Sequence, residues 1–133
     1  MIVVDTNIVV YLYLPTEFTG EAEQLLNHDP VWAAPVLWRS EFRNVLALYL
    51  RKELVNLTKA LQLQTEAESL LLENEYEVPS LDVFQLVQIS TCSAYDCEFV
   101  ALAQKLGTKL ITMDKAILNS FPDTAISLKA FVS

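Results

Sequence analysis

The sequence predicts an α/β domain with three layers, in which helices cover both faces of a mainly parallel sheet of four or five strands. Short β-branched, apolar runs alternate with longer segments of helical periodicity, which is the pattern of successive βα units. Gly occurs only twice, so a sheet of tight hairpins is not expected. The 133 residues, of which 53% are hydrophobic, suit a single domain over residues 1–133 with a sizeable core.

Five segments are expected to form strands. The first, residues 2–5, is an uninterrupted apolar run up to Asp5, as a strand covered by helices on both faces requires. Prolines bound the second segment, and Gly107 is a suitable helix stop before the fourth. In chain order the expected strands are 2–5, 31–34, 76–78, 109–112 and 125–128.

Seven segments carry apolar residues three and four positions apart and are expected to be helices. They are 7–14, 19–27, 36–52, 58–74, 81–91, 95–106 and 115–120. Right-handed crossovers would place these helices on both faces of the sheet. Ligands of such sheets bind beyond the carboxyl ends of the strands. Asp5 closes the first strand and Asp114 lies two residues beyond Thr112, so both carboxylates are expected at the same rim.

Glu41 is expected to point inward from a helix. At about 100° per residue, its neighbours on the same face are Leu37, Trp38, Val45 and Leu48. A carboxylate on such a face loses hydration, which is costly unless a charge or a metal compensates. Arg39 and Arg43 project from the opposite side of the helix, so another group must satisfy Glu41.

Asp96 repeats this pattern in a second helix. Its neighbours on the same face are Cys92, Phe99, Val100 and Ala103. Glu98 is expected on the far face, beside Lys105 and in solvent. One short helix would therefore direct one acid inward and another outward.

Each of these acids also has an ordinary structural explanation. Asp5 and Asp114 can cap the helices that follow them, Ser93 and Asp96 can form a capping box, and Glu41 can be partly exposed near a helix end. Considered together they indicate a site, because two are expected at one rim and two on inward helix faces. Clustered carboxylates repel one another, and a hard divalent cation such as Mg²⁺ or Mn²⁺ relieves that repulsion.

The net charge of −8 reflects 17 acidic against 9 basic residues. This balance argues against a general nucleic-acid binder, because phosphate contacts usually come from Lys and Arg. Cys92 and Cys97 have no metal-site or disulfide-framework spacing and are expected to be reduced. No signal peptide and no membrane span are expected, which points to a soluble, cytoplasmic protein.

Four segments resemble the motifs of the PIN-domain family, above all its VapC-type toxin branch. In the order of the family they are VDTNI at 4–8, SEFRNVL at 40–46, SAYDCEFVALA at 93–103 and LITMDK at 110–115. Two positions depart from the family pattern. Cys97 stands where a small residue such as Ala is common, and Ile117 where an aromatic residue is frequent. Neither departure replaces an acid.

The resemblance implies a PIN-like fold and a metal-dependent endoribonuclease, the toxin of a type II toxin–antitoxin pair. It implies that Asp5, Glu41, Asp96 and Asp114 bind one or two Mg²⁺ or Mn²⁺ ions, with Asp5 and Asp96 as the most direct ligands. Asn7 and Thr112 would orient carboxylates or a water, although a turn amide and an exposed strand-end hydroxyl explain them equally well. The resemblance further implies an RNA substrate, a homodimer and a small antitoxin whose basic tail enters the acidic groove.

Three alternatives predict other patterns. A receiver-like binding module would place a second acid after the first strand, where this chain has Thr6 and Asn7. A metal-dependent phosphatase with an Asp nucleophile would need an acid at position 7. A catalytically silent PIN-like module would lack one of the four acids, and none is missing.

Overall fold

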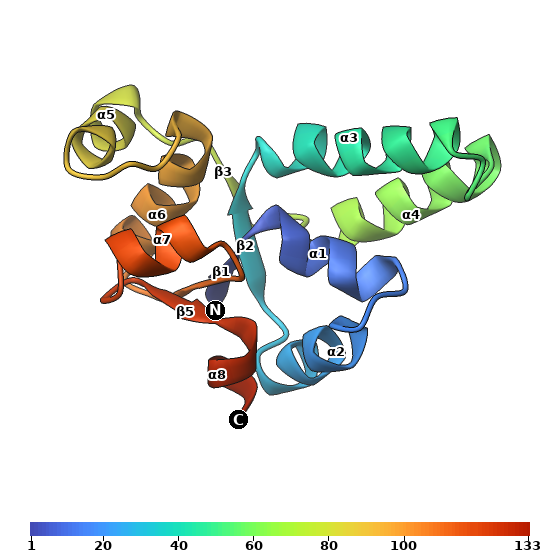
Figure 1. Ribbon diagram of the computed structural model, residues 1–133, viewed down its shortest axis with the longest axis horizontal. Coiled ribbons are helices and arrows are strands. Elements are labelled where there is room, and N and C mark those ends of the chain that lie inside the picture. The colour runs from blue at the N-terminus through green and yellow to red at the C-terminus, as the bar shows by residue number, and fades with distance from the viewer.

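Five short strands form the central sheet of the computed structural model, which describes residues 1–133 (Figure 1). They are β1 (Ile2–Val4), β2 (Trp32–Pro35), β3 (Glu75–Tyr76), β4 (Leu110–Thr112) and β5 (Ala125–Ser127). Their order in the sheet is β3-β2-β1-β4-β5, and every neighbouring pair is parallel. The chain first extends the sheet from β1 towards β3 and then returns to the other side of β1. The strand order therefore reverses between β1 and β4, where sheets of this kind bind their ligands.

Eight helices cover the sheet. They are α1 (Thr6–Tyr13), α2 (Thr19–His28), α3 (Trp38–Arg51), α4 (Leu57–Leu70), α5 (Ser80–Gln88), α6 (Ala94–Leu106), α7 (Lys115–Ser120) and α8 (Leu128–Val132). Figure 1 shows α1 to α4 on one side of the sheet and α5 to α7 on the other, with α8 beside α2 and β5. The predicted three-layer α/β fold with a parallel sheet is confirmed.

The core extends through both helical layers. A single cluster of 32 buried residues includes all of β1 and most of the other central strands, as continuous apolar strands require. Trp32 and Trp38 are fully buried within it. Cys92 and Cys97 are buried free thiols. No helix has the length and apolar character needed to cross a bilayer.

The only element that the sequence did not predict is α8. Its five residues are too few to show a helical period, and the sequence predicts its first residue, Leu128, as the end of the last strand. Ser127 ends β5 and caps the helix, because its Oγ accepts a hydrogen bond from the Ala130 amide at 3.2 Å. The expected helix at 58–74 also ends earlier, at Leu70.

Candidate active site

One cavity of about 510 Å³ receives all four predicted acids. Asp5 directly follows β1 and Asp114 follows β4 by two residues, so both lie beyond the carboxyl ends of neighbouring strands. Glu41 comes from α3 and Asp96 from the first turn of α6. Four segments that are remote in sequence therefore meet at the point where the strand order reverses. No Lys or Arg lines the cavity.

Asp5 is the most buried of the four acids, with 9% of its surface exposed. Its Oδ1 accepts a hydrogen bond from the Thr6 amide at 2.8 Å, and its Oδ2 accepts one from Thr112 Oγ1 at 2.7 Å. Burial raises the pKa of the Asp5 carboxyl to about 6, and the nearby charges of Glu41 and Asp96 add to this rise. The two hydrogen bonds oppose it, because they stabilise the ionised form. Asp5 therefore carries a charge that the protein only partly compensates.

Thr112 links two of the acids. Its side chain is fully buried in β4, where its hydroxyl donates to Asp5 and accepts from the Asp114 amide at 3.0 Å. Asp114 in turn caps α7, since its Oδ1 accepts from the Ile117 amide at 3.0 Å. Asp114 thus caps α7, as expected, and also lines the cavity.

Glu41 is joined to Asp5 through Thr6. The Thr6 hydroxyl donates to Glu41 Oε1 at 2.7 Å, while the amide of the same residue donates to Asp5. Burial raises the pKa of Glu41, and the charge of Asp96 raises it further. Thr6 was not singled out from the sequence. The available signal was a hydroxyl directly after Asp5 at the start of a helix.

The predicted face of α3 requires a correction. Its buried side chains are Trp38, Phe42 and Leu46, whereas Leu48 is 48% exposed. The core-facing stripe is thus rotated by about one residue from the predicted one, because α3 packs against α1 and α4. Glu41 lies half-buried at the edge of the core and faces the cavity.

Asp96 reaches the cavity from the start of α6. Ser93 caps this helix by accepting a hydrogen bond from the Asp96 amide at 3.1 Å. Burial raises the pKa of Asp96, and the neighbouring charge of Asp114 adds to the rise. Here the capping side chain is that of Ser93, and the Asp96 carboxylate is left to line the cavity.

The structure also bears on the predictions for Glu98 and Asn7. Glu98 is not solvated as predicted: it is half-buried, and burial together with the charge of Glu41 raises its pKa. Glu98 lies near Glu41 of α3, so it is directed towards another charged group and not into open solvent. Asn7 does line the cavity, but it is exposed and forms no hydrogen bond with an acid.

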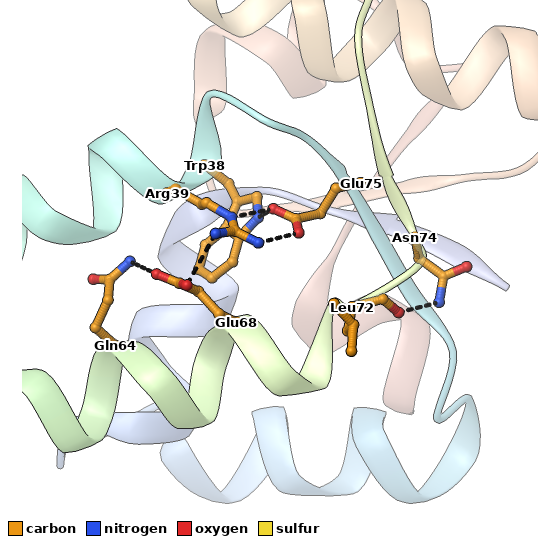
Figure 2. Close-up of polar contacts among 7 residues, drawn as sticks. All are labelled: Trp38, Arg39, Gln64, Glu68, Leu72, Asn74 and Glu75. Carbon is orange, nitrogen blue, oxygen red and sulfur yellow. Dashed lines mark hydrogen bonds and ion pairs between the residues drawn. The ribbon is translucent and has the colours of Figure 1, made fainter.

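A polar cluster fixes the start of α3 (Figure 2), and Glu41 lies in the first turn of the same helix. Arg39 donates to both carboxylate oxygens of Glu75, each at 2.6 Å, and to Glu68 at 2.9 Å. Trp38 Nε1 also donates to Glu75, at 2.8 Å. Because Glu75 lies in β3 and Glu68 in α4, the cluster ties the first turn of α3 to two other elements. The Arg39 guanidinium holds the pKa of Glu75 below its usual range.

The donor set of the cavity suits a hard cation. No group of three or more His, Cys, Asp or Glu side chains is placed so that it could hold a metal ion by itself. Mg²⁺ does not need such a cage, because it keeps several waters and usually binds through one or two carboxylates and the substrate phosphate. An open cavity with four carboxylates and no Lys or Arg side chain fits this mode of binding. It offers none of the Cys and His ligands that are typical of zinc sites.

The chain matches the family model of the PIN domain over residues 2–123 and therefore belongs to the PIN domain family. It is similar to Ribonuclease VapC3 of Pyrobaculum aerophilum, with 30% identity over 91% of this chain and 95% of that protein. This likeness agrees with the VapC-type branch that the four motifs indicate. Family membership sets aside the receiver-like and phosphatase alternatives.

Solved structures share the fold. PAE2754 from Pyrobaculum aerophilum has a TM-score of 0.77 at 20% identity, covering 98% of this chain and 85% of that one. A toxin–antitoxin complex from Klebsiella pneumoniae contains a chain with a TM-score of 0.71 at 19% identity, covering 96% of this chain and 98% of that one.

Proposed function

We propose that this protein is a Mg²⁺- or Mn²⁺-dependent endoribonuclease that hydrolyses RNA phosphodiester bonds, and the toxin of a type II toxin–antitoxin pair. The observation that carries the proposal is that Asp5, Glu41, Asp96 and Asp114 line one cavity, which contains no Lys or Arg side chain. Membership of the PIN domain family and the similarity to a VapC ribonuclease support the same reaction class.

Asp5, Glu41, Asp96 and Asp114 would hold one or two cations, in part through water. A bound divalent cation supplies an activated water and neutralises the charge that develops on the phosphate. The protein holds two of these carboxylates in place before a cation binds. Both oxygens of Asp5 and one oxygen of Glu41 are held by hydrogen bonds from Thr6 and Thr112, so little side-chain freedom remains to be lost on binding.

The negative charges of the cavity determine which cations and which RNA substrates it can bind. Three of its acids have a raised pKa because of burial, so each gains from a cation that compensates its charge. Two divalent ions would cancel the four negative charges and allow a phosphate to approach. The net charge of −8 for the whole chain still opposes non-specific RNA binding. A selective RNA substrate therefore fits better than general RNA degradation.

The proposal includes protein partners. The similarity to a chain of a toxin–antitoxin complex supports a small antitoxin, and an acidic cavity is suited to a basic antitoxin segment that excludes RNA. A homodimer, as the family resemblance implies, would present the RNA in a groove between two such cavities.

The proposal is tested by RNA cleavage with purified protein in Mn²⁺, in Mg²⁺ and in EDTA. We expect cleavage with either ion, none in EDTA, and loss of activity in Asp5→Asn. Asp123→Asn is the matched control, because Asp123 is exposed and lies outside the cavity. Cleavage by Asp5→Asn at the wild-type rate would show that the site assignment is wrong.

A further inference from the structure

Tyr95 differs from the other tyrosines of the chain. Four of the five tyrosines pack against the hydrophobic core. Tyr95 does not, and its side chain is 62% exposed. Its ring stacks on no other aromatic ring, and only the hydroxyl of Tyr13 is hydrogen bonded among the tyrosines. The contacts of the Tyr95 ring within the chain therefore give no structural reason for an aromatic residue at this position.

The position of Tyr95 places this ring at the candidate active site. It precedes Asp96 in the first turn of α6 and lines the same cavity as the four acids. Leu37 and Val45, from the start and the second turn of α3, line that cavity as well. These three side chains are the hydrophobic part of its lining. One cavity thus combines an acidic region with an aromatic and aliphatic region.

The size of the cavity exceeds what an ion and a phosphate require. Its volume of about 510 Å³ lies within the range of about 300–1,000 Å³ that is typical of small-molecule sites. An RNA strand that is cut at the acidic region continues on both sides of the phosphate, and each neighbouring nucleotide carries a flat base. Unpaired RNA bases stack on aromatic side chains, and apolar side chains commonly cover the other face of an extruded base.

We infer that Tyr95, together with Leu37 and Val45, forms a subsite for one unpaired nucleobase next to the phosphate that is cut. The inference rests on the proposed ribonuclease function and adds to it a residue outside the acid cluster that positions the substrate. A base in a duplex is covered by its stacked neighbours and does not offer a face to Tyr95. The tyrosine acts by positioning the strand, and the acids carry out the chemistry.

Two variants of Tyr95 separate stacking from other roles. Tyr95→Phe keeps the aromatic face, and we expect its kcat/KM to stay close to that of the wild type. Tyr95→Leu keeps an exposed apolar side chain without the aromatic face, and we expect kcat/KM to fall between about 5- and 150-fold, the range for one stacked base. Phe84→Leu is the matched control, because Phe84 on α5 is also 62% exposed and lies outside the cavity.

The substrate provides the decisive arm of the experiment. The probe is a short single-stranded RNA with all four bases, whose cut site is first mapped with wild-type protein in Mn²⁺. The base is then removed, in separate substrates, from the nucleotide on each side of the cut. We expect one abasic substrate to slow the wild type as much as Tyr95→Leu does, and to slow Tyr95→Leu no further. The inference would be overturned if the abasic substrates reduced kcat/KM by the same factor in the wild type and in Tyr95→Leu. It would also be overturned if Tyr95→Leu cleaved the intact RNA at the wild-type rate.

A binding arm keeps this test separate from the test of the proposed function. Fluorescence anisotropy, with Ca²⁺ in place of Mn²⁺, compares the labelled RNA with a fully abasic strand of the same length. If the wild type binds the RNA through Tyr95 but never cleaves it, the nuclease proposal falls, and Tyr95 is left as a base-binding residue with no cut phosphate beside it. If the wild type neither binds nor cleaves, both fall. A change of oligomeric state in Tyr95→Leu would assign the ring to a protein interface and overturn the inference.

Discussion

Thr112 Oγ1 donates a 2.7 Å hydrogen bond to Asp5 Oδ2, although the two residues are 107 positions apart in the sequence. The bond joins the end of β4 to the residue that follows β1, the two strands between which the strand order reverses. The same hydroxyl accepts from the Asp114 amide. One buried side chain therefore orients one acid of the cavity and the backbone of another.

Thr112→Val should change both stability and the pH dependence of cleavage. Valine keeps the shape of the side chain but leaves Asp5 Oδ2 and the Asp114 amide without this partner, which we expect to lower the free energy of unfolding by about 1–3 kcal/mol. Loss of a hydrogen bond to the ionised form raises the pKa of Asp5 further, so the acidic limb of the activity profile should move to higher pH. Urea unfolding and cleavage rates between pH 5 and 8 measure the two effects.

Thr108→Val is the control for this substitution. The Thr108 hydroxyl also makes a 2.7 Å hydrogen bond, to the Met1 carbonyl, but at an exposed position outside the cavity. The acidic limb should not move in this variant. Identical limbs in wild type and Thr112→Val would show that the hydroxyl does not act on Asp5.

The free energy of unfolding should depend on pH through Asp5. Burial raises its pKa in the folded protein from 3.8 to about 6, so the protonated form favours the folded state. This contribution is complete below the unfolded-state pKa and is lost as the pH rises through about 6. In EDTA we expect the wild type to gain roughly 2 kcal/mol relative to Asp5→Asn on going from pH 7 to pH 4. Urea titrations of the two proteins measure the difference, and parallel pH profiles would refute it.

Divalent cations should stabilise the folded protein through the acid cluster. A cation that binds only the folded state adds RT ln(1 + [L]/Kd), or about 2.7 kcal/mol at a hundredfold excess over Kd. We expect Mn²⁺ to raise the melting temperature of the wild type measured after EDTA treatment. Glu41→Gln should melt at a higher temperature than the wild type in EDTA, because it removes a half-buried charge, and should gain less from Mn²⁺. A full Mn²⁺ shift in Glu41→Gln would exclude Glu41 from the cation site.

Arg39 should support the site by fixing the start of α3. Arg39→Met leaves Glu75 with only the Trp38 indole as a donor, and we expect a loss of about 1–3 kcal/mol in the free energy of unfolding. Cleavage should weaken as well, since Glu41 lies in the turn that Arg39 holds. Arg43→Met is the matched control: Arg43 lies on the same helix, is exposed and forms no ion pair. Equal effects in urea unfolding would show that the cluster contributes nothing specific.

The sequence predicted elements whose signals are local. The apolar run of β1 and the helix stop at Gly107, which adopts a left-handed φ of 65°, could be recognised without knowledge of any partner segment. Ser93 was likewise predicted as a helix cap from its immediate neighbours, and the structure shows that bond. The short α8 gave no period because it has only five residues.

The parts of the site that the sequence missed depend on contacts between distant segments. The bond from Thr6 to Glu41 spans 35 positions, and the direction of Glu41 depends on how α3 packs against α1 and α4. Periodicity placed the buried stripe of α3 about one residue away from its actual position. The sequence predicts Glu98 in solvent because no local signal shows that it lies near Glu41 of α3. That the four acids line one cavity could still be predicted, because two of them follow strand ends at one rim of the sheet and two lie on inward helix faces, whatever the exact packing.

The most direct test of the account is an anomalous difference map from crystals of this protein grown with Mn²⁺. The account predicts one or two peaks in the cavity, with the nearest carboxylate oxygens belonging to Asp5 or Asp96 and lying within about 2.5 Å of a peak. Peaks only at exposed acids such as Asp123, or an empty cavity at saturating Mn²⁺, would contradict it.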